Sequence, residues 1–418
     1  MANVSAPRYI NDELDEQFAG EQRAIERRRR FVISLDLYLV LAVGVLVAIG
    51  LMMVWSTTFF WSDPQSAIFL QQMRSALFGT IAMLILGAID YRIWRKLAIP
   101  LMGIVMIALL GLLILPGIKG FTNVRRAYFD GSVQPSELAV LIVVVYMAAW
   151  LASKQSKLRS LTYGLLPFAA LVGIVAGLII LEPDLSTAAL ILVVAATMFF
   201  LAGADWLQMG ITAVVFSAVG VIAVNNIDYA RARYQSFIDL LRDPIQAHAS
   251  HAQNVITAFL NGGLTGVGLG QGYQKFFNLS APHTDSIFAV VGEELGLIGC
   301  ALIIGLYVLL MIRGFRTARN APDLFGALLA SGITLAIVVE ALFNIAAMAS
   351  VLPLIGVPLP FISFGGSSLV ASMAGIGLLI SISRAAARTK PVTRKVSETL
   401  NLPGVRGSIS RVRQRPVE

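Results

Sequence analysis

Apolar runs of about twenty residues follow one another along most of the chain and are separated by short polar segments. A run of this length, coiled as an α-helix, matches the hydrocarbon core of a bilayer. A membrane β-barrel would show alternating segments of about ten residues instead. The pattern therefore predicts an all-α polytopic membrane protein with ten spans: 36–57, 68–89, 97–116, 135–151, 161–181, 185–202, 207–224, 285–312, 325–350 and 361–383.

The composition excludes the soluble, fibrous and disordered classes. Of 418 residues, 57% are hydrophobic and 13% are charged, whereas soluble domains have about 45–50% and about 25%. The one cysteine, Cys300, lies within an apolar run, which excludes an internal disulfide and a cysteine metal cluster.

The positive charges predict the orientation. Ten spans place both termini on one side, and 24 of the 32 Lys and Arg residues fall on that side. Cationic loops stay in the cytoplasm because their translocation is unfavourable. We therefore expect a cytoplasmic tail at 1–35, a transmembrane domain at 36–383 and a basic cytoplasmic tail at 384–418.

Two outer loops are unusually long, 117–134 and 225–284, and loops of this size often have a function. The second, between the seventh and eighth spans, contains RARYQSFIDLLRDP. That stretch predicts an amphipathic helix at the membrane interface.

A first cluster of polar residues pairs Arg125 and Arg126 with the motif QPSEL. Pro135 suits the first turn of a helix, which places Glu137 about one turn inside the membrane face. Glu137 is either an acid that stabilises the helix dipole or part of a substrate site. Arginines on the outer side favour binding of an anion such as phosphate.

A second cluster, LEPDLST, separates two spans. We favour turn chemistry for Glu182 and Asp184, with Asp184 capping the following helix.

A third cluster, APHTDSIFAVVGEELG, begins the eighth span. Either Thr284 or Asp285 can cap that helix, and Glu293 and Glu294 follow about two turns further in. Acids at membrane depth are costly and persist chiefly beside a cavity or a partner. A function for Asp285 is favoured over a cap because the neighbouring outer loop is so long, whereas His283 alone is typical of a loop histidine.

A fourth cluster, SVLPLIGVPLPFISFGGSSL, predicts non-helical backbone at membrane depth. Its free amides, near Ser367, could bind anions, but a stiff packing loop explains it equally well. All four clusters map to the outer side, so we expect one outward-facing polar pocket. The cytoplasmic loops contain no nucleotide-binding motif, so no nucleotide cofactor and no nucleic acid partner are expected.

Four motifs in order, QPSEL, EPDLSTA, GVGLGQGYQKFF with HTDSIFAVVGEELG, and VPLPFISFGGSS, make residues 33–384 resemble the SEDS family. Its members are membrane peptidoglycan polymerases of shape, elongation, division and sporulation. The GVGLG and QKFF stretch and the N-terminal extension are more similar to the division branch than to the elongation branch, which is the alternative.

This resemblance implies a glycosyltransferase of the bacterial cytoplasmic membrane that acts on lipid II and the growing glycan chain. It implies a class B penicillin-binding transpeptidase as partner, beside other division proteins of the membrane. The catalytic aspartate of the family corresponds to Asp285, and its polar cavity to Glu137 and Arg126. The lysine usual three residues after that glutamate is Val140 here, which shifts the role of the substrate cation to Arg125, Arg126 or Lys275.

The implied chemistry leaves two roles open for Asp285. It deprotonates the acceptor hydroxyl, or it holds a divalent cation, Mg or Mn, that neutralises the diphosphate. The candidate substrate-binding residues are Arg125, Arg126, Glu137, Lys275, His283 and Ser367.

Two other functions compete with polymerisation. A lipid II flippase would suit ten spans with buried acids, but transporters place their site near the midplane, often within inverted repeats. A scaffold without activity would leave the buried acids unexplained.

Overall fold

The computed structural model describes residues 36–58, 64–114, 134–242, 251–277, 279–353 and 356–389, and residues 36–383 form one compact unit. The described residues contain helices and no strands, which confirms the expected all-α fold class. Within them, nine helices are long and apolar enough to cross a membrane, and a tenth apolar helix, α7, is shorter. The apolar helices are α2 Leu37–Thr58, α3 Pro64–Ala88, α4 Arg92–Ile114, α5 Pro135–Lys154, α6 Leu166–Leu181, α7 Leu185–Leu201, α8 Trp206–Asn226, α12 Ile287–Asn320, α13 Leu324–Met348 and α14 Gly366–Thr389.

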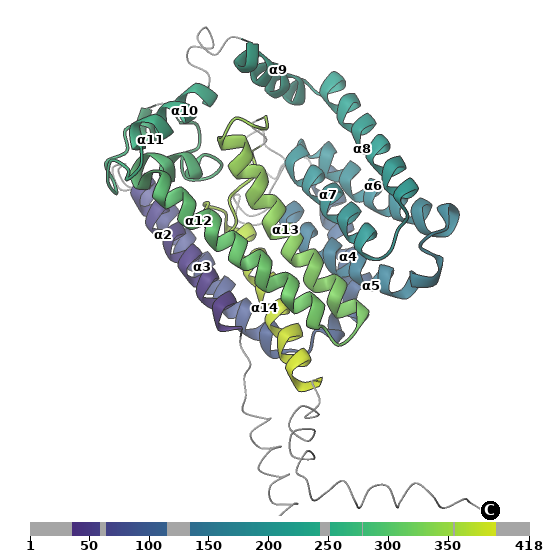
Figure 1. Cartoon of the computed structure of the whole chain (residues 1–418). Coiled ribbons are helices and arrows are strands. Elements are labelled where there is room, and N and C mark those ends of the chain that lie inside the picture. The colour runs from purple at the N-terminus through teal and green to yellow at the C-terminus, as the bar shows by residue number, and fades with distance from the viewer. Residues whose placement is uncertain are drawn as a thin grey trace, which may run out of the picture. The chain divides into compact units, whose positions relative to one another are not determined.

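The buried centre of the bundle is formed by α13 and α14 (Figure 1). In their most apolar stretches 67% and 78% of residues are buried, against 17% in α8 at the periphery. Helix α13 packs against α5, α7 and α12. Close packing of α3 on α14 requires a glycine, since a Cβ at Gly377 would lie 2.6 Å from the carbonyl oxygen of Met83.

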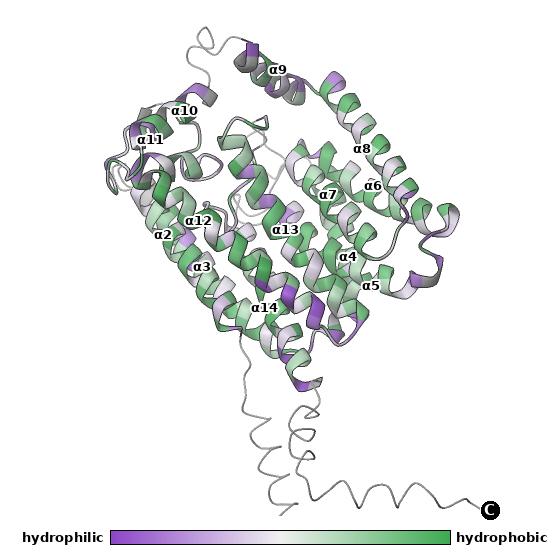
Figure 2. Ribbon diagram, viewed as in Figure 1, coloured by the Kyte–Doolittle hydropathy of each residue, from purple (hydrophilic) through white to green (hydrophobic). Residues whose placement is uncertain are grey.

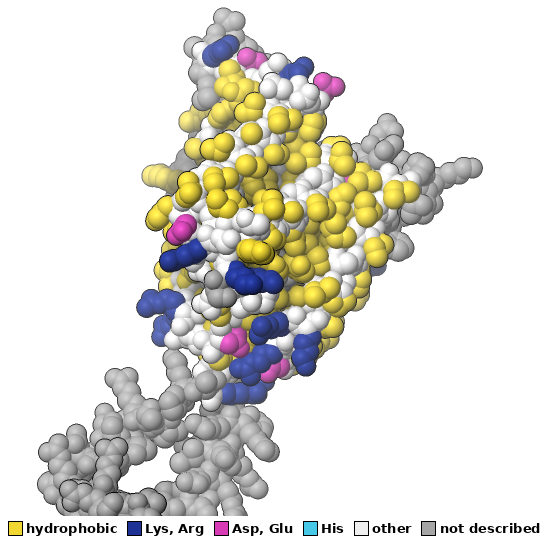
Figure 3. Space-filling view, turned by 90° about the vertical axis from the view of Figure 1, so that its right-hand side faces the viewer, with side chains coloured by type: hydrophobic (Ala, Val, Ile, Leu, Met, Phe, Trp, Pro, Cys, Tyr) yellow, Lys and Arg dark blue, Asp and Glu magenta, His cyan; other side chains and the backbone are white. Residues whose placement is uncertain are grey.

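The surface is that of a membrane protein. Figure 2 shows hydrophobic residues along the helices and hydrophilic ones mostly at their ends. On the face in Figure 3, hydrophobic side chains cover most of the surface, and Lys and Arg gather toward one end. Apolar sides with cations at one end are what a bilayer requires of a spanning body.

Three further helices, α9 Asp228–Arg242, α10 His251–Gly262 and α11 Gln274–Phe277, connect α8 to α12. They lie at the end of the bundle where α12 begins and α13 ends (Figure 1). Helix α9 coincides with the stretch that the sequence predicts as an amphipathic helix, and this part of the prediction is confirmed.

The eighth predicted span differs from the structure at its start. The N-cap of α12 is Ser286, without a side-chain hydrogen bond, so the expected caps Thr284 and Asp285 are wrong. The helix is also interrupted at Gly296, whose φ of +66° an L side chain rarely adopts.

Backbone groups freed by this interruption are paired by the loop after α10. The amides of Leu297 and Ile298 donate to the carbonyls of Gly263 and Leu264, at 3.0 and 3.1 Å. Non-helical backbone at membrane depth is tolerated only where protein or water pairs it. A segment of the long outer loop therefore packs against α12 at this interruption and supplies the missing hydrogen-bond acceptors.

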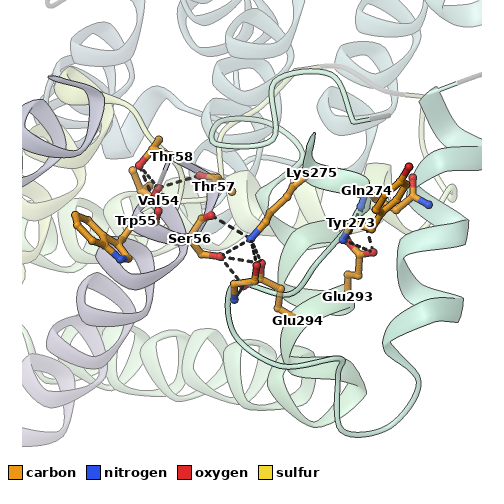
Figure 4. A network of polar contacts seen from close by, with 11 residues as sticks. Val54, Trp55, Ser56, Thr57, Thr58, Tyr273, Gln274, Lys275, Glu293 and Glu294 are labelled. Carbon is orange, nitrogen blue, oxygen red and sulfur yellow. Dashed lines mark hydrogen bonds and ion pairs between the residues drawn. The ribbon is translucent and has the colours of Figure 1, made fainter. Parts of the chain in front are cut away.

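A buried ion pair fixes the same loop to α2 and α12 (Figure 4). The Lys275 ammonium lies 2.5 Å from Glu294, and both side chains are fully buried. Lys275 also donates to the hydroxyl of Ser56 and the carbonyl of Gly270, at 2.8 and 3.1 Å. Ser56 in turn donates to Glu294, so both charges are compensated inside the protein.

The neighbouring acid, Glu293, holds the backbone of α11. Its carboxylate accepts from the amides of Tyr273 and Gln274, both at 3.1 Å, and from the side chain of Asn261 at 3.5 Å. The two glutamates that the sequence places beside Asp285 therefore anchor the outer loop.

The tenth predicted span, 361–383, also begins too early. Residues 356–365 are not helical, and α14 starts at Gly366. The amide of Gly365 donates to the side chain of Gln72 at 3.3 Å, and that side chain donates to the carbonyl of Ser363 at 3.1 Å. Partners from α3 thus replace helical hydrogen bonds.

We expect Lys275→Met to lower the midpoint of thermal unfolding of the detergent-solubilised protein, because it leaves the Glu294 carboxylate buried without its cation. Removal of one partner of a buried pair typically costs about 3–5 kcal/mol. Lys275→Met with Glu294→Gln should recover most of the loss, and Lys96→Met, at an exposed position, should change little. A single Lys275→Met variant as stable as the unmodified protein would contradict this.

Candidate active site

A cavity of about 310 Å³ lies where α5, α7, α13 and α14 meet the loops that precede α12 and α14. Its lining takes residues from all four polar clusters of the sequence: Gln134 and Glu137; Asp184, Ser186 and Thr187; Thr284 and Asp285; and residues 356–358 with 364–368. The clusters are up to 234 positions apart in the chain, and the fold brings them into one pocket.

The first wall joins the N-termini of α5 and α14. Pro135 occupies the first turn of α5, as expected, and Glu137 follows in the same turn. The Ser367 hydroxyl donates to the Glu137 carboxylate at 2.5 Å and accepts from the amide of Gln134 at 3.1 Å. Ser367 therefore ties the two helices together at the cavity.

The second wall is the N-terminus of α7. Asp184 caps this helix by accepting from the amide of Thr187 at 3.2 Å, which confirms the expected cap. Its other oxygen accepts from Ser136 and from the Gln134 side chain, at 3.0 and 3.1 Å. Asp184 is thus a cap and a cavity residue at once, where the sequence favours the cap alone.

The Asp285 carboxylate is presented by two loops that are bonded to each other. The Ser363 hydroxyl donates to the carbonyl of Thr284 at 2.7 Å. The amide of Phe364 donates to the carbonyl of His283 at 2.8 Å. From α13, the Asn344 amide donates to the carbonyls of Asp285 and Val357, at 2.8 and 2.7 Å. Hydrogen bonds to the carbonyls of His283, Thr284 and Asp285 therefore fix the backbone that presents the Asp285 carboxylate.

A fourth acid of the cavity, Glu340, comes from α13 and is missed by the sequence analysis. It is hydrogen-bonded to Ser368 and interacts electrostatically with Glu137 and Asp184. The available signal was an ionisable residue inside an apolar span, which by itself indicates a functional site.

The side chains that line the cavity include acids but no bases among the described residues. Its described lining includes Glu137, Asp184, Asp285 and Glu340 but no Lys, Arg or His. The N-termini of α5, α7, α12 and α14 surround it, and each has a partial positive charge. These helix ends favour the carboxylates and any anion that enters.

The structure places only some of the predicted substrate-binding residues at the cavity. Glu137 and Ser367 line the cavity with Asp285. Lys275 does not line it and is enclosed in the ion pair with Glu294. Arg125 and Arg126 lie outside the described residues.

His283 is not among the residues that line the cavity. Its ring makes an edge contact with Phe364, with centroids 5.7 Å apart. Burial lowers the pKa of His283 below its ordinary value, so the ring is neutral at pH 7. The ring thus supplies no positive charge to the site.

Glu182, in the turn between α6 and α7, is 1% exposed, and its carboxyl oxygens have no hydrogen-bond partner among the described residues. Burial and the nearby Asp184 carboxylate raise the pKa of Glu182 to about 8, so the group is largely protonated at pH 7. Glu182 does lie in a turn, as favoured from the sequence, but its carboxyl group is buried there.

The cavity acids do not form a metal centre in the part of the chain that the structure describes. No group of three or more His, Cys, Asp or Glu side chains there converges closely enough to hold a metal ion. The divalent cation, Mg or Mn, that the sequence suggests for Asp285 therefore stays a prediction.

Comparisons with known proteins match the whole transmembrane body. The model of the FtsW, RodA and SpoVE family, described as cell cycle proteins, matches residues 36–388. A probable peptidoglycan glycosyltransferase FtsW of Trichlorobacter lovleyi is 36% identical over 86% of this chain and 96% of its own. Stage V sporulation protein E of Bacillus subtilis is 36% identical over 84% and 97%.

Solved structures agree with these relatives. A chain of a peptidoglycan synthase complex that coordinates polymerisation and crosslinking is 28% identical, with a TM-score of 0.69 over 85% of this chain and 99% of that one. The rod shape determining protein RodA of Thermus thermophilus is 27% identical, with a TM-score of 0.60 over 85% and 98%. The expected SEDS relationship is confirmed: this chain belongs to the FtsW, RodA and SpoVE family of cell cycle proteins.

Proposed function

We propose that the chain is a peptidoglycan glycosyltransferase that polymerises lipid II on the outer face of the cytoplasmic membrane, in septal wall synthesis. The observation that supports this most is the position of Asp285, held by backbone hydrogen bonds at a polar cavity inside a membrane bundle. The names of the FtsW relatives support the same activity.

The reaction needs little beyond one base and stabilisation of charge. A sugar hydroxyl of the acceptor attacks the anomeric carbon of the donor, whose bond to the diphosphate breaks, and the hydroxyl proton passes to Asp285. Diphosphate is already a good leaving group, so the second carboxylate that a glycosidase requires to protonate an alkoxide is unnecessary.

The remaining cavity groups suit a sugar substrate. Glu137, Asp184 and Glu340 are acceptors for sugar hydroxyls, while Gln134 and Ser367 add polar contacts. The surrounding helix N-termini favour the negative charge that develops on the departing diphosphate.

Glu340 is the one observation that favours lipid II transport instead, because transporters place ionisable residues within spans. The presentation of Asp285 by paired loops and the names of the relatives favour polymerisation.

Partners and orientation are part of the proposal. A synthase complex among the similar structures coordinates polymerisation with crosslinking, which supports a transpeptidase partner for this chain, as the family resemblance implies. The excess of Lys and Arg on the side of the termini supports cytoplasmic tails and an outward-facing cavity.

The direct test is Asp285→Asn in the purified full chain, with and without a cognate transpeptidase, incubated with labelled lipid II. Removal of the base should lower the rate of glycan formation about 10²–10⁴-fold. Asp239→Asn, at an exposed acid of α9, serves as the matched control and should polymerise normally. Wild-type rates in the Asp285→Asn variant would refute the assigned role.

Asn344 offers a separate test of how Asp285 is positioned. Asn344→Leu removes both hydrogen bonds to the loop carbonyls, and displacement of a catalytic group by about 1 Å can cost about 100-fold. We expect kcat to fall while KM for lipid II stays nearly constant.

The control for Asn344 is Ser331→Ala on the same helix. The Ser331 hydroxyl donates to the carbonyl of Ala327, one turn earlier in α13. Ser331→Ala should retain kcat. If Asn344→Leu loses activity only because less of the protein is folded, and kcat of the folded fraction is unchanged, Asn344 has no positioning role.

A further inference from the structure

Helix α9 turns one of its arginines toward the protein. Ala230 is buried, and Arg233, Phe237 and Ile238 are partly buried, a spacing of three to four residues that defines one helix face. The exposed Arg231 lies on another face, where it donates to the carbonyl of Asn225. The two arginines are thus two positions apart and point in different directions.

The inward arginine reaches the catalytic carboxylate at Gly356. A Cβ built on Gly356 would lie 3.0 Å from Oδ2 of Asp285 and 3.1 Å from Nη1 of Arg233. Gly356 itself lines the cavity and has a φ of +72°. The guanidinium and the carboxylate therefore share the space above one glycine, at the edge of the cavity.

The cavity needs a cation at this place. Its described lining has four acids and no basic residue. A lipid-linked diphosphate has negative charge that increases on the leaving group in the transition state, and cations placed there lower the barrier.

We propose that Arg233 binds the diphosphate of the lipid-linked substrate beside Asp285 and stabilises it as the leaving group. This rests on the proposed glycosyl transfer. The planar guanidinium can bind two phosphate oxygens at once, which a lysine cannot do. As the donor's sugar–oxygen bond breaks, the electron pair goes to the diphosphate next to Arg233 and the acceptor proton goes to Asp285.

The glycine permits this arrangement. Any side chain at position 356 would meet both groups at about 3 Å, and its positive φ would be strained for an L residue. The loop that holds Asp285 thus also provides the room in which Arg233 approaches.

Arg233→Gln and Arg233→Lys, with Arg231→Gln as the matched control from the same helix, test the proposal in the full-length protein. Initial polymerisation rates are measured against lipid II concentration, together with inhibition by the product undecaprenyl diphosphate. We expect Arg233→Gln to lower kcat/KM about 10²–10³-fold and to weaken product inhibition at least tenfold.

The two other variants should separate charge from geometry. Arg233→Lys should lie between Arg233→Gln and the unmodified enzyme, and Arg231→Gln should match the latter. Adding Val140→Lys to Arg233→Gln should restore part of the rate and part of the product inhibition, because it returns a cation to the cavity wall.

Two outcomes overturn the proposal: Arg233→Gln behaves like Arg231→Gln, or it loses rate while product inhibition is unchanged, which indicates a structural role for α9. If the unmodified protein forms no glycan, the proposed function fails by itself. Binding of labelled undecaprenyl diphosphate to the unmodified protein and to Arg233→Gln then still decides whether Arg233 binds the diphosphate.

Discussion

Irregular backbone inside a membrane bundle has to be hydrogen-bonded by the protein or by water in a cavity, and this requirement determines where the site can be. The structure meets it twice. The interruption of α12 at Gly296 is paired by the loop after α10, and the segment before α14 is paired by Gln72, Ser363 and Asn344. The second of these arrangements holds Asp285 at the cavity. The hydrogen bonds that the irregular backbone requires therefore also fix the geometry of the site.

Sequence patterns predict the apolar helices well, because bilayer thickness imposes their length and composition. The convergence of the four polar clusters is also predicted, since acids and non-helical motifs inside spans have few stable environments. Helix starts at Ile287 and Gly366 are missed by a few residues. There the chain is held by tertiary hydrogen bonds from α3 and α13, which no local pattern records.

Individual charges are harder to assign than clusters. Lys275 is a reasonable substrate cation from its place in a conspicuous motif, yet Glu294 and Ser56 enclose it. Arg233 belongs to a stretch that indicates only an interfacial helix, yet its guanidinium lies near Asp285 across Gly356. The difference depends on which partners the fold brings to each cation, such as Ser56, which is 219 positions from Lys275, and spacing along the sequence does not contain that information.

The small peripheral role of α8 has a mechanical consequence. Because 17% of its apolar stretch is buried, most of this stretch is left for the surrounding lipid, while the adjoining α9 bears Arg233. Tilt or thickness changes in the bilayer would therefore be transmitted along α8 to the cation over Asp285, so that the composition of the membrane becomes a variable of the catalytic centre.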